Sequence, residues 1–204
     1  MLRSFWRELT DVVHPADQAV FDANPHSFNL EYPPPAFVGD PAAPVVVLYA
    51  NGGYDPVLTP QEFADPGAAG RYREQLHGLS SAIPSYYRGH AMGDWLEAGL
   101  AVRVNAVAYR SKRLSEEPTN QALVDKLPSV ALHRRWILEE VLPQALAGDR
   151  FLIVHRNGAW RLDRSLAGPT VAFSSNPISA SPSKEPVERV RQWLVGRGQL
   201  AAMT

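Results

Sequence analysis

Residues 45–49 (VVVLY), with the segment 51–56 (NGGYDP) close behind, decide the fold. Five consecutive apolar and mostly β-branched residues are typical of a strand, and apolar side chains on both faces favour a central strand of a parallel sheet. Asn, Gly, Asp and Pro are turn-forming residues. We therefore expect the strand to end near Tyr49 and the chain to turn directly after it.

Three further apolar runs have the length of strands: 100–108 (LAVRVNAVA), 150–155 (RFLIVH) and 170–173 (TVAF). Strands that alternate with helical segments predict βαβ crossovers and a parallel sheet. We expect an α/β fold, a three-layer α/β/α sandwich around a four-stranded, mainly parallel sheet. Helices are expected at about 68–80, 88–98, 119–127, 129–147 and 184–198.

The whole chain, 1–204, is expected to form one domain. Its composition, 45% hydrophobic and 20% charged, is typical of globular proteins. Residues 1–43 are expected to provide an N-terminal amphipathic helix over 1–20 and then an extended Pro-rich strap. Three consecutive prolines at 33–35 fix φ and remove backbone donors, which keeps the strap extended.

Composition and charge exclude several classes of function. The chain contains no cysteine, which excludes disulfides, thiolate catalysis and cysteine-held metal clusters. The net charge is −1, so DNA binding requires a local basic patch. Residues 1–18 carry acidic residues within the apolar stretch, and no apolar run approaches the ~20 residues of a membrane span. We expect a cytoplasmic monomer without a membrane partner.

The segments that follow the four predicted strands are expected to converge, because ligands of open parallel sheets bind beyond the carboxyl ends of the strands. No Walker loop, dinucleotide fingerprint, nucleophile elbow or HExxH pair occurs in the sequence. No metal or organic cofactor is implied. The converging segments are 51–55, 109–113, 156–160 and 174–184.

Four motifs in these places carry a family resemblance. In chain order they are 49–56 (YANGGYDP), 102–111 (VRVNAVAYRS), 151–160 (FLIVHRNGAW) and 174–185 (SSNPISASPSKE). Together, over about residues 45–194, they resemble the motifs of the uracil-DNA glycosylase superfamily. The resemblance implies a DNA glycosylase that hydrolyses the N-glycosidic bond of uracil or a related damaged base, with DNA as partner.

The resemblance also assigns roles to single residues. Asn51 matches the residue that positions the hydrolytic water, and Asn105 matches the residue that reads the flipped base. Asn176, followed by Pro177, matches the second catalytic motif, where it would stabilise the leaving base. Two departures are Gly52, where most members have proline, and Asn176, which replaces the histidine of the most active members.

The remaining site residues follow from the chemistry. A base must be extruded and then read along its hydrogen-bonding edge, and donors must stabilise the departing anion. The backbone amides of Gly52 and Gly53, together with Tyr54, are candidate groups for binding the flipped nucleobase. Asp55 is an alternative to Asn51, as a catalytic base that activates the water. Tyr87 and Tyr109 are alternative stacking platforms. The expected DNA-binding residues are Arg110, Lys112, Arg113, Arg156 and Lys184, and the resemblance adds Ile178 and Ser179 from the loop that would enter the minor groove.

Structural alternatives stand beside each assignment. Asn51-Gly52-Gly53 can be a turn that requires positive φ, and Asn105 can make a structural hydrogen bond. The basic loops can be ordinary solvated charge. His155, at the end of a predicted strand, can be an acid or base or a structural histidine.

Two other functions remain open. The first is a non-catalytic nucleotide- or nucleic-acid-binding module with the same fold. The second is a hydrolase of small N-glycosides, which would need no basic face and which a neutral or acidic rim would favour.

Overall fold

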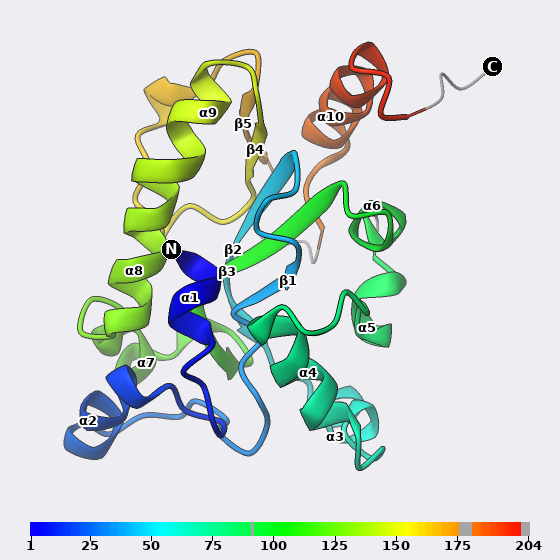
Figure 1. The fold of residues 1–204 in the computed structure, drawn as a ribbon. Coiled ribbons are helices and arrows are strands. Elements are labelled where there is room, and N and C mark those ends of the chain that lie inside the picture. The colour runs from blue at the N-terminus through cyan, green and yellow to red at the C-terminus, as the bar shows by residue number, and fades with distance from the viewer. Residues whose placement is uncertain (91, 176–180, 201–204) are drawn as a thin grey trace.

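The computed structural model describes residues 1–90, 92–175 and 181–200. Its centre is a five-stranded sheet in the order β1-β3-β2-β4-β5 (Figure 1). Strands β2, β3, β4 and β5 are parallel and cover the four predicted strands, whereas β1 pairs antiparallel with β3. The strands are β1 (Phe37–Gly39), β2 (Val45–Gly53), β3 (Ala101–Ser111), β4 (Phe151–Val154) and β5 (Val171–Phe173).

The predicted number of four strands is therefore wrong, because the sheet has five strands and is mixed. The additional strand β1 lies in the segment expected to be an extended strap. Three residues of that segment form the strand, with Phe37 opposite Val104 and Gly39 opposite Val102, and Asn29 forms an isolated bridge with Arg110. A three-residue edge strand directly after consecutive prolines leaves no periodic apolar pattern in the sequence.

Most predicted helices are present, although several are divided. Residues 1–20 form two short helices rather than one, and 88–98 overlaps two others, whereas 129–147 contains a π-helical turn between two α-helices. Helix α3 was not predicted. The helices are α1 (Leu2–Trp6), α2 (Pro15–Ala23), α3 (Leu58–Glu62), α4 (Ala68–His77), α5 (Ser85–Arg88), α6 (Gly93–Glu97), α7 (Pro118–Leu123), α8 (Pro128–Trp136), the π-helix Ile137–Val141, α9 (Leu142–Leu146), α10 (Lys184–Gly196) and the 3-10 turns Leu114–Glu116 and Arg164–Leu166.

Helices pack against both faces of the sheet (Figure 1). Alternate residues of β2 belong to different apolar clusters, because side chains along a strand point to opposite faces. Val46 and Leu48 belong to the cluster that includes α1, α8 and α9, whereas Val45, Val47 and Tyr49 belong to the cluster that includes α5, α6 and α10. Because β2 is buried on both faces, its sequence is a continuous apolar run.

Strand β2 continues four residues beyond Tyr49, through the segment expected to turn. Gly52 pairs with Arg110 and Gly53 with Ser111, after a register shift between Asn51 and Gly52. Neither glycine is among the described residues with positive φ. The turn interpretation is therefore wrong, because β3 extends to Ser111 and gives the Asn-Gly-Gly segment a pairing partner. Among the described residues, no helix is both long and apolar enough to span a membrane.

A buried histidine joins three segments beneath the sheet. The indole Nε1 of Trp6 donates to His133 Nε2 over 2.7 Å, and His133 Nδ1 donates to the backbone oxygen of Asn105, also over 2.7 Å. Both bonds require the neutral imidazole with its proton on Nδ1. Burial lowers the pKa of His133 to about 4, although its bond to the Asn105 carbonyl opposes the shift.

Acidification is expected to destabilise the fold through His133. Since its pKa is lowered from 6.5 to about 4 in the folded protein, its contribution is present above pH 6.5 and is lost as the pH falls towards 4. Between pH 7 and pH 5 the free energy of unfolding should fall by about 2 kcal/mol through this residue. Urea unfolding at both pH values measures the loss.

The matched comparison uses His133→Gln and His26→Gln. His133→Gln should be less stable than the parent at pH 7 and should lose most of the pH dependence. His26→Gln should keep most of it, because the His26 side chain is only partly buried, although burial lowers its pKa as well. An equal pH dependence in His133→Gln and the parent would exclude His133 as its source.

Candidate functional site

The candidate site is a cleft of about 910 Å³ at the carboxyl ends of β2, β3 and β4. Strand β2 lies between its two successors in the chain, with β3 on one side and β4 on the other. Such a reversal of strand order is where open α/β sheets bind their ligands. Among the described residues, three of the four predicted loops contribute to the cleft: Asn51 follows the core of β2, 112–116 follows β3, and 156–161 follows β4.

Tyr49 and Trp160 fix the loop after β4 against the central strand. The Trp160 indole donates to the backbone oxygen of Tyr49 over 2.8 Å. Asn157 closes the same loop, since its side chain donates to the Leu162 carbonyl and accepts from the Leu162 amide. Arg161, between them, has a φ of 58°, a strained conformation for a residue other than glycine. The loop therefore holds Arg161 at the edge of the cleft.

The walls of the cleft are strongly basic. Glu116 is the single acidic side chain among its described lining residues. Glu116 pairs with Arg113 over 2.8 Å, and Asp125 pairs with Arg134 over 2.8 Å and also with Arg161. Two carboxylates therefore face five cations, which leaves a surplus of positive charge. The five basic lining residues are Lys112, Arg113, Arg134, Arg156 and Arg161.

Asn51 lies in the cleft, as its predicted role requires. Its side chain is buried, and Nδ2 donates to the Gly52 carbonyl, the Ser111 carbonyl and Ser111 Oγ over 2.9, 3.1 and 2.9 Å. Oδ1 accepts no hydrogen bond from the described residues. The amide is therefore held rigidly by its nitrogen, and its oxygen remains able to accept a hydrogen bond from water or a ligand.

Gly52 is needed for close packing. A Cβ at this position would lie 2.8 Å from the Ala108 carbonyl oxygen and 2.8 Å from Pro35 Cγ. At Gly53 a Cβ would have open space within 4 Å. Because both residues pair with β3, their backbones belong to the sheet. Tyr54 continues this connection, since its backbone amide donates to the Ser111 carbonyl over 3.1 Å.

Asp55 caps a helix and does not line the cleft. One carboxylate oxygen accepts from the backbone amides of Val57 and Leu58 at the start of α3, each over 2.8 Å. These two bonds lower the pKa of Asp55. A carboxylate with a lowered pKa is a weaker base, so the geometry gives Asp55 a structural role.

Asn105 is fully buried beneath the Pro-rich strap. Its Nδ2 donates to the Pro35 carbonyl over 2.5 Å, and its backbone amide donates to the Ala36 carbonyl. Oδ1 is buried without a hydrogen-bond partner among the described residues. Asn105 does not line the cleft, so the structure does not bring it together with Asn51 there.

The predicted DNA-binding residues separate into three groups. Lys112, Arg113 and Arg156 line the cleft. Arg110 points inward instead, where it donates to the Pro33 and Gly53 carbonyls and lies 4.0 Å from Glu62. Lys184 is exposed at the start of α10 but does not line the cleft. Asn176, Ile178 and Ser179 lie outside the described residues.

The alternative stacking and acid–base residues are buried. Tyr109 donates to Asp17 over 2.6 Å, and burial raises its pKa. Tyr87 is covered within the core, and His155 packs edge-on to Tyr49 with the ring centroids 5.0 Å apart. None of these three residues lines the cleft.

Sequence reasoning missed Arg134 and Arg161 as site residues. Arg134 projects from α8, far from any strand end in the sequence, and donates to the Ala159 carbonyl over 2.8 Å. Only Arg161 gave a signal, since it directly follows the last residue of the predicted strand-end loop 156–160. Among the described residues, no group of three or more His, Asp or Glu side chains could hold a metal ion.

Comparisons with protein-family models, curated proteins and solved structures give no match. The site is therefore interpreted from its own geometry.

Replacing either glycine of β2 tests the packing that shapes the cleft. Gly52→Ala should destabilise the fold by about 1–3 kcal/mol, because the added Cβ clashes with backbone and with a rigid proline ring. Gly53→Ala should be neutral or slightly stabilising, since the added Cβ meets open space. Thermal unfolding of both variants gives the comparison, and equal stabilities would contradict the packing role of Gly52.

Proposed function

We propose that the chain binds DNA in the basic cleft at the carboxyl ends of β2, β3 and β4, as a three-layer α/β/α domain of the uracil-DNA glycosylase type. The observation that carries the proposal is the charge of the cleft, where five cations face two carboxylates in a protein of net charge −1. Concentrating positive charge at one crevice of a nearly neutral protein favours a polyanionic ligand.

The identity of the cations also supports this partner. Four of the five are arginines, whose planar guanidinium groups match phosphate oxygens better than an ammonium group does. The cleft volume of about 910 Å³ accommodates nucleotide-sized groups. The basic rim disfavours a hydrolase of small neutral N-glycosides.

Base excision is a second candidate function, favoured by one observation. Asn51 Oδ1 has no hydrogen-bond partner among the described residues and lies in the cleft. It can therefore orient a water for attack on the anomeric carbon, while basic side chains stabilise the departing base anion.

The same site lacks a strong base among its described lining residues. It contains no histidine, and its single carboxylate, Glu116, is paired with Arg113. Excision would therefore depend on a well-developed sugar cation and on water orientation rather than on proton abstraction. A modest rate follows from this arrangement.

Removing one cation from the cleft tests DNA binding. Lys112→Ala should weaken binding of a fluorescent duplex about threefold to tenfold and should reduce the slope of log K against log salt by about one. Fluorescence anisotropy at several salt concentrations measures both quantities. Arg73→Ala is the matched control, because Arg73 lies on α4 outside the cleft, and it should bind like the parent.

Equal weakening by Lys112→Ala and Arg73→Ala would show that binding is diffuse rather than localised in the cleft. No salt-dependent binding by the parent protein would remove DNA as the partner.

Excision is tested on end-labelled DNA that carries one uracil, opposite G, opposite A or unpaired. Alkali-sensitive strand breakage should appear with the parent and disappear with Asn51→Ala, because the water loses its acceptor. Asp55→Asn should keep the activity, since asparagine can cap α3 as aspartate does.

Loss of breakage in Asp55→Asn alone would assign the base to Asp55 and not to Asn51. Absence of breakage on all substrates, with DNA binding retained, would leave the non-catalytic binding module as the function.

A further inference from the structure

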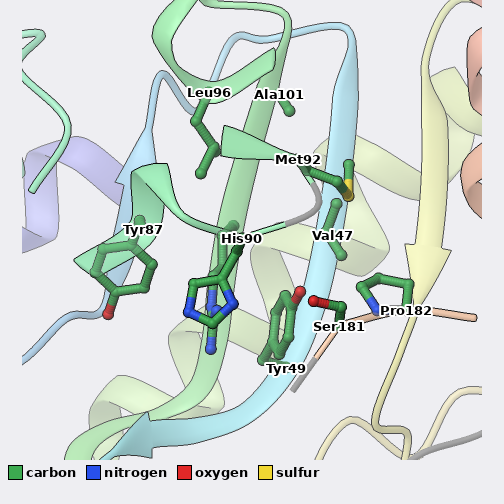
Figure 2. Close-up of a pocket in the computed structure, with 10 residues that line it drawn as sticks. Val47, Tyr49, Tyr87, His90, Met92, Leu96, Ala101, Ser181 and Pro182 are labelled. Carbon is green, nitrogen blue, oxygen red and sulfur yellow. The ribbon is translucent and has the colours of Figure 1, made fainter. Parts of the chain in front are cut away.

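A second pocket lies against the face of the sheet that α5 and α6 cover. It is small, with a volume of about 20 Å³, and β2, β3 and the segment before α10 supply its walls. Figure 2 shows His90 between Tyr87 and Tyr49, with Ser181 and Pro182 on the other side of Tyr49. None of these residues lines the basic cleft.

Arg103 of β3 lines this pocket between two aromatic rings. Its Cζ lies 3.6 Å from the centroid of the Tyr49 ring and 5.1 Å from that of the Tyr87 ring. Its Nε is buried and has no hydrogen-bond partner among the described residues. The two rings fix the plane of the guanidinium but accept no conventional hydrogen bond from it.

Arg103 also has no carboxylate partner among the described residues, and the remaining ten residues contain no aspartate or glutamate. A guanidinium N–H that is removed from water normally acquires an acceptor, because a buried donor without one is costly. Arg110, the deeply buried arginine of this strand, has Glu62 nearby and two backbone acceptors, whereas Arg103 is partly buried and its buried Nε has no acceptor among the described residues.

Of two titratable groups that interact with Arg103, Arg156 adds a positive charge and His90 adds none. Burial and the charge of Arg103 both lower the pKa of His90, so its imidazole is neutral at neutral pH. Burial lowers the pKa of Arg156, and the charge of Arg103 lowers it further, so the two cations repel one another. A dianion would relieve this repulsion and would satisfy the free donor of Arg103.

We propose that the pocket formed by Arg103, Tyr49, Tyr87 and His90 binds the terminal phosphate of a phosphate monoester. The fork of Arg103 donates to the phosphoryl oxygens, and the His90 imidazole and the Tyr49 hydroxyl are additional donors. The pocket volume admits a group about the size of one water, so one phosphoryl oxygen enters and the rest of the ligand stays at the mouth. A phosphate diester has less charge and fewer terminal oxygens and fits less well.

This site is independent of the proposed DNA cleft, and calorimetric titration of the full chain with methyl phosphate tests it. The parent should bind methyl phosphate, and dimethyl phosphate should bind about tenfold more weakly or not at all. Arg103→Met should lower the affinity about tenfold or more, whereas Arg103→Lys, which keeps the charge but loses the fork, should give an intermediate loss.

Two controls separate this site from the cleft and from general charge. Lys112→Ala and Arg73→Met should leave methyl phosphate binding unchanged, even though Lys112→Ala weakens DNA binding. Circular dichroism establishes that each variant is folded. Comparing a 5′-phosphorylated oligonucleotide with its 5′-hydroxyl form then distinguishes a strand end from a small free phosphate as the source of the monoester.

Two results would overturn the proposal. One is the absence of methyl phosphate binding to the parent protein. The other is equal affinity in the parent and in folded Arg103→Met or Arg103→Lys, which would leave Arg103 as a packing residue between two tyrosines.

Discussion

The contact between Gly52, Pro35 and the Ala108 carbonyl determines how the carboxyl end of β2 lies against β3 and the strap. Because no side chain separates these backbones, β2 keeps pairing after its register shift and continues to Gly53. That extension brings Asn51 against Ser111, where three hydrogen bonds from one nitrogen hold the amide. The position of the acceptor oxygen in the cleft therefore depends on a glycine that makes no contact with a ligand.

The same strand ends determine where the basic side chains lie. Arg110, beside the extended end of β2, turns inward to carbonyls and Glu62 and acts as a structural cation. The basic residues that reach the cleft come from loops after β3 and β4 and from α8. Arg156 lines the cleft, and its pKa is lowered by burial and, to a smaller extent, by the charge of Arg103. A nearly neutral protein thus presents a surplus of positive charge at one end of its sheet.

The four parallel strands were predictable because each is an apolar run buried on both faces. Strand β1 was not predictable, since three residues after a proline run are too few to show a periodic apolar pattern. The full length of β2 was not predictable either, since its last three residues are of types that usually form turns. Asn51 was placed correctly in the cleft by strand order alone. Asn105 is hydrogen-bonded to the strap, and Asp55 to the start of α3. The sequence around each residue gave no sign of these partners. Arg134 reaches the cleft through the packing of α8, which is a tertiary property.

Hydrogen–deuterium exchange of the full chain with and without a DNA duplex tests the central claim most directly, because it locates the bound surface without a substitution. The account predicts slower exchange on binding in residues 112–116 and 156–161, which form the basic walls of the cleft, and unchanged exchange in α4. Protection confined to α4 or other segments outside the cleft, or no protection at DNA concentrations that saturate binding, would contradict it.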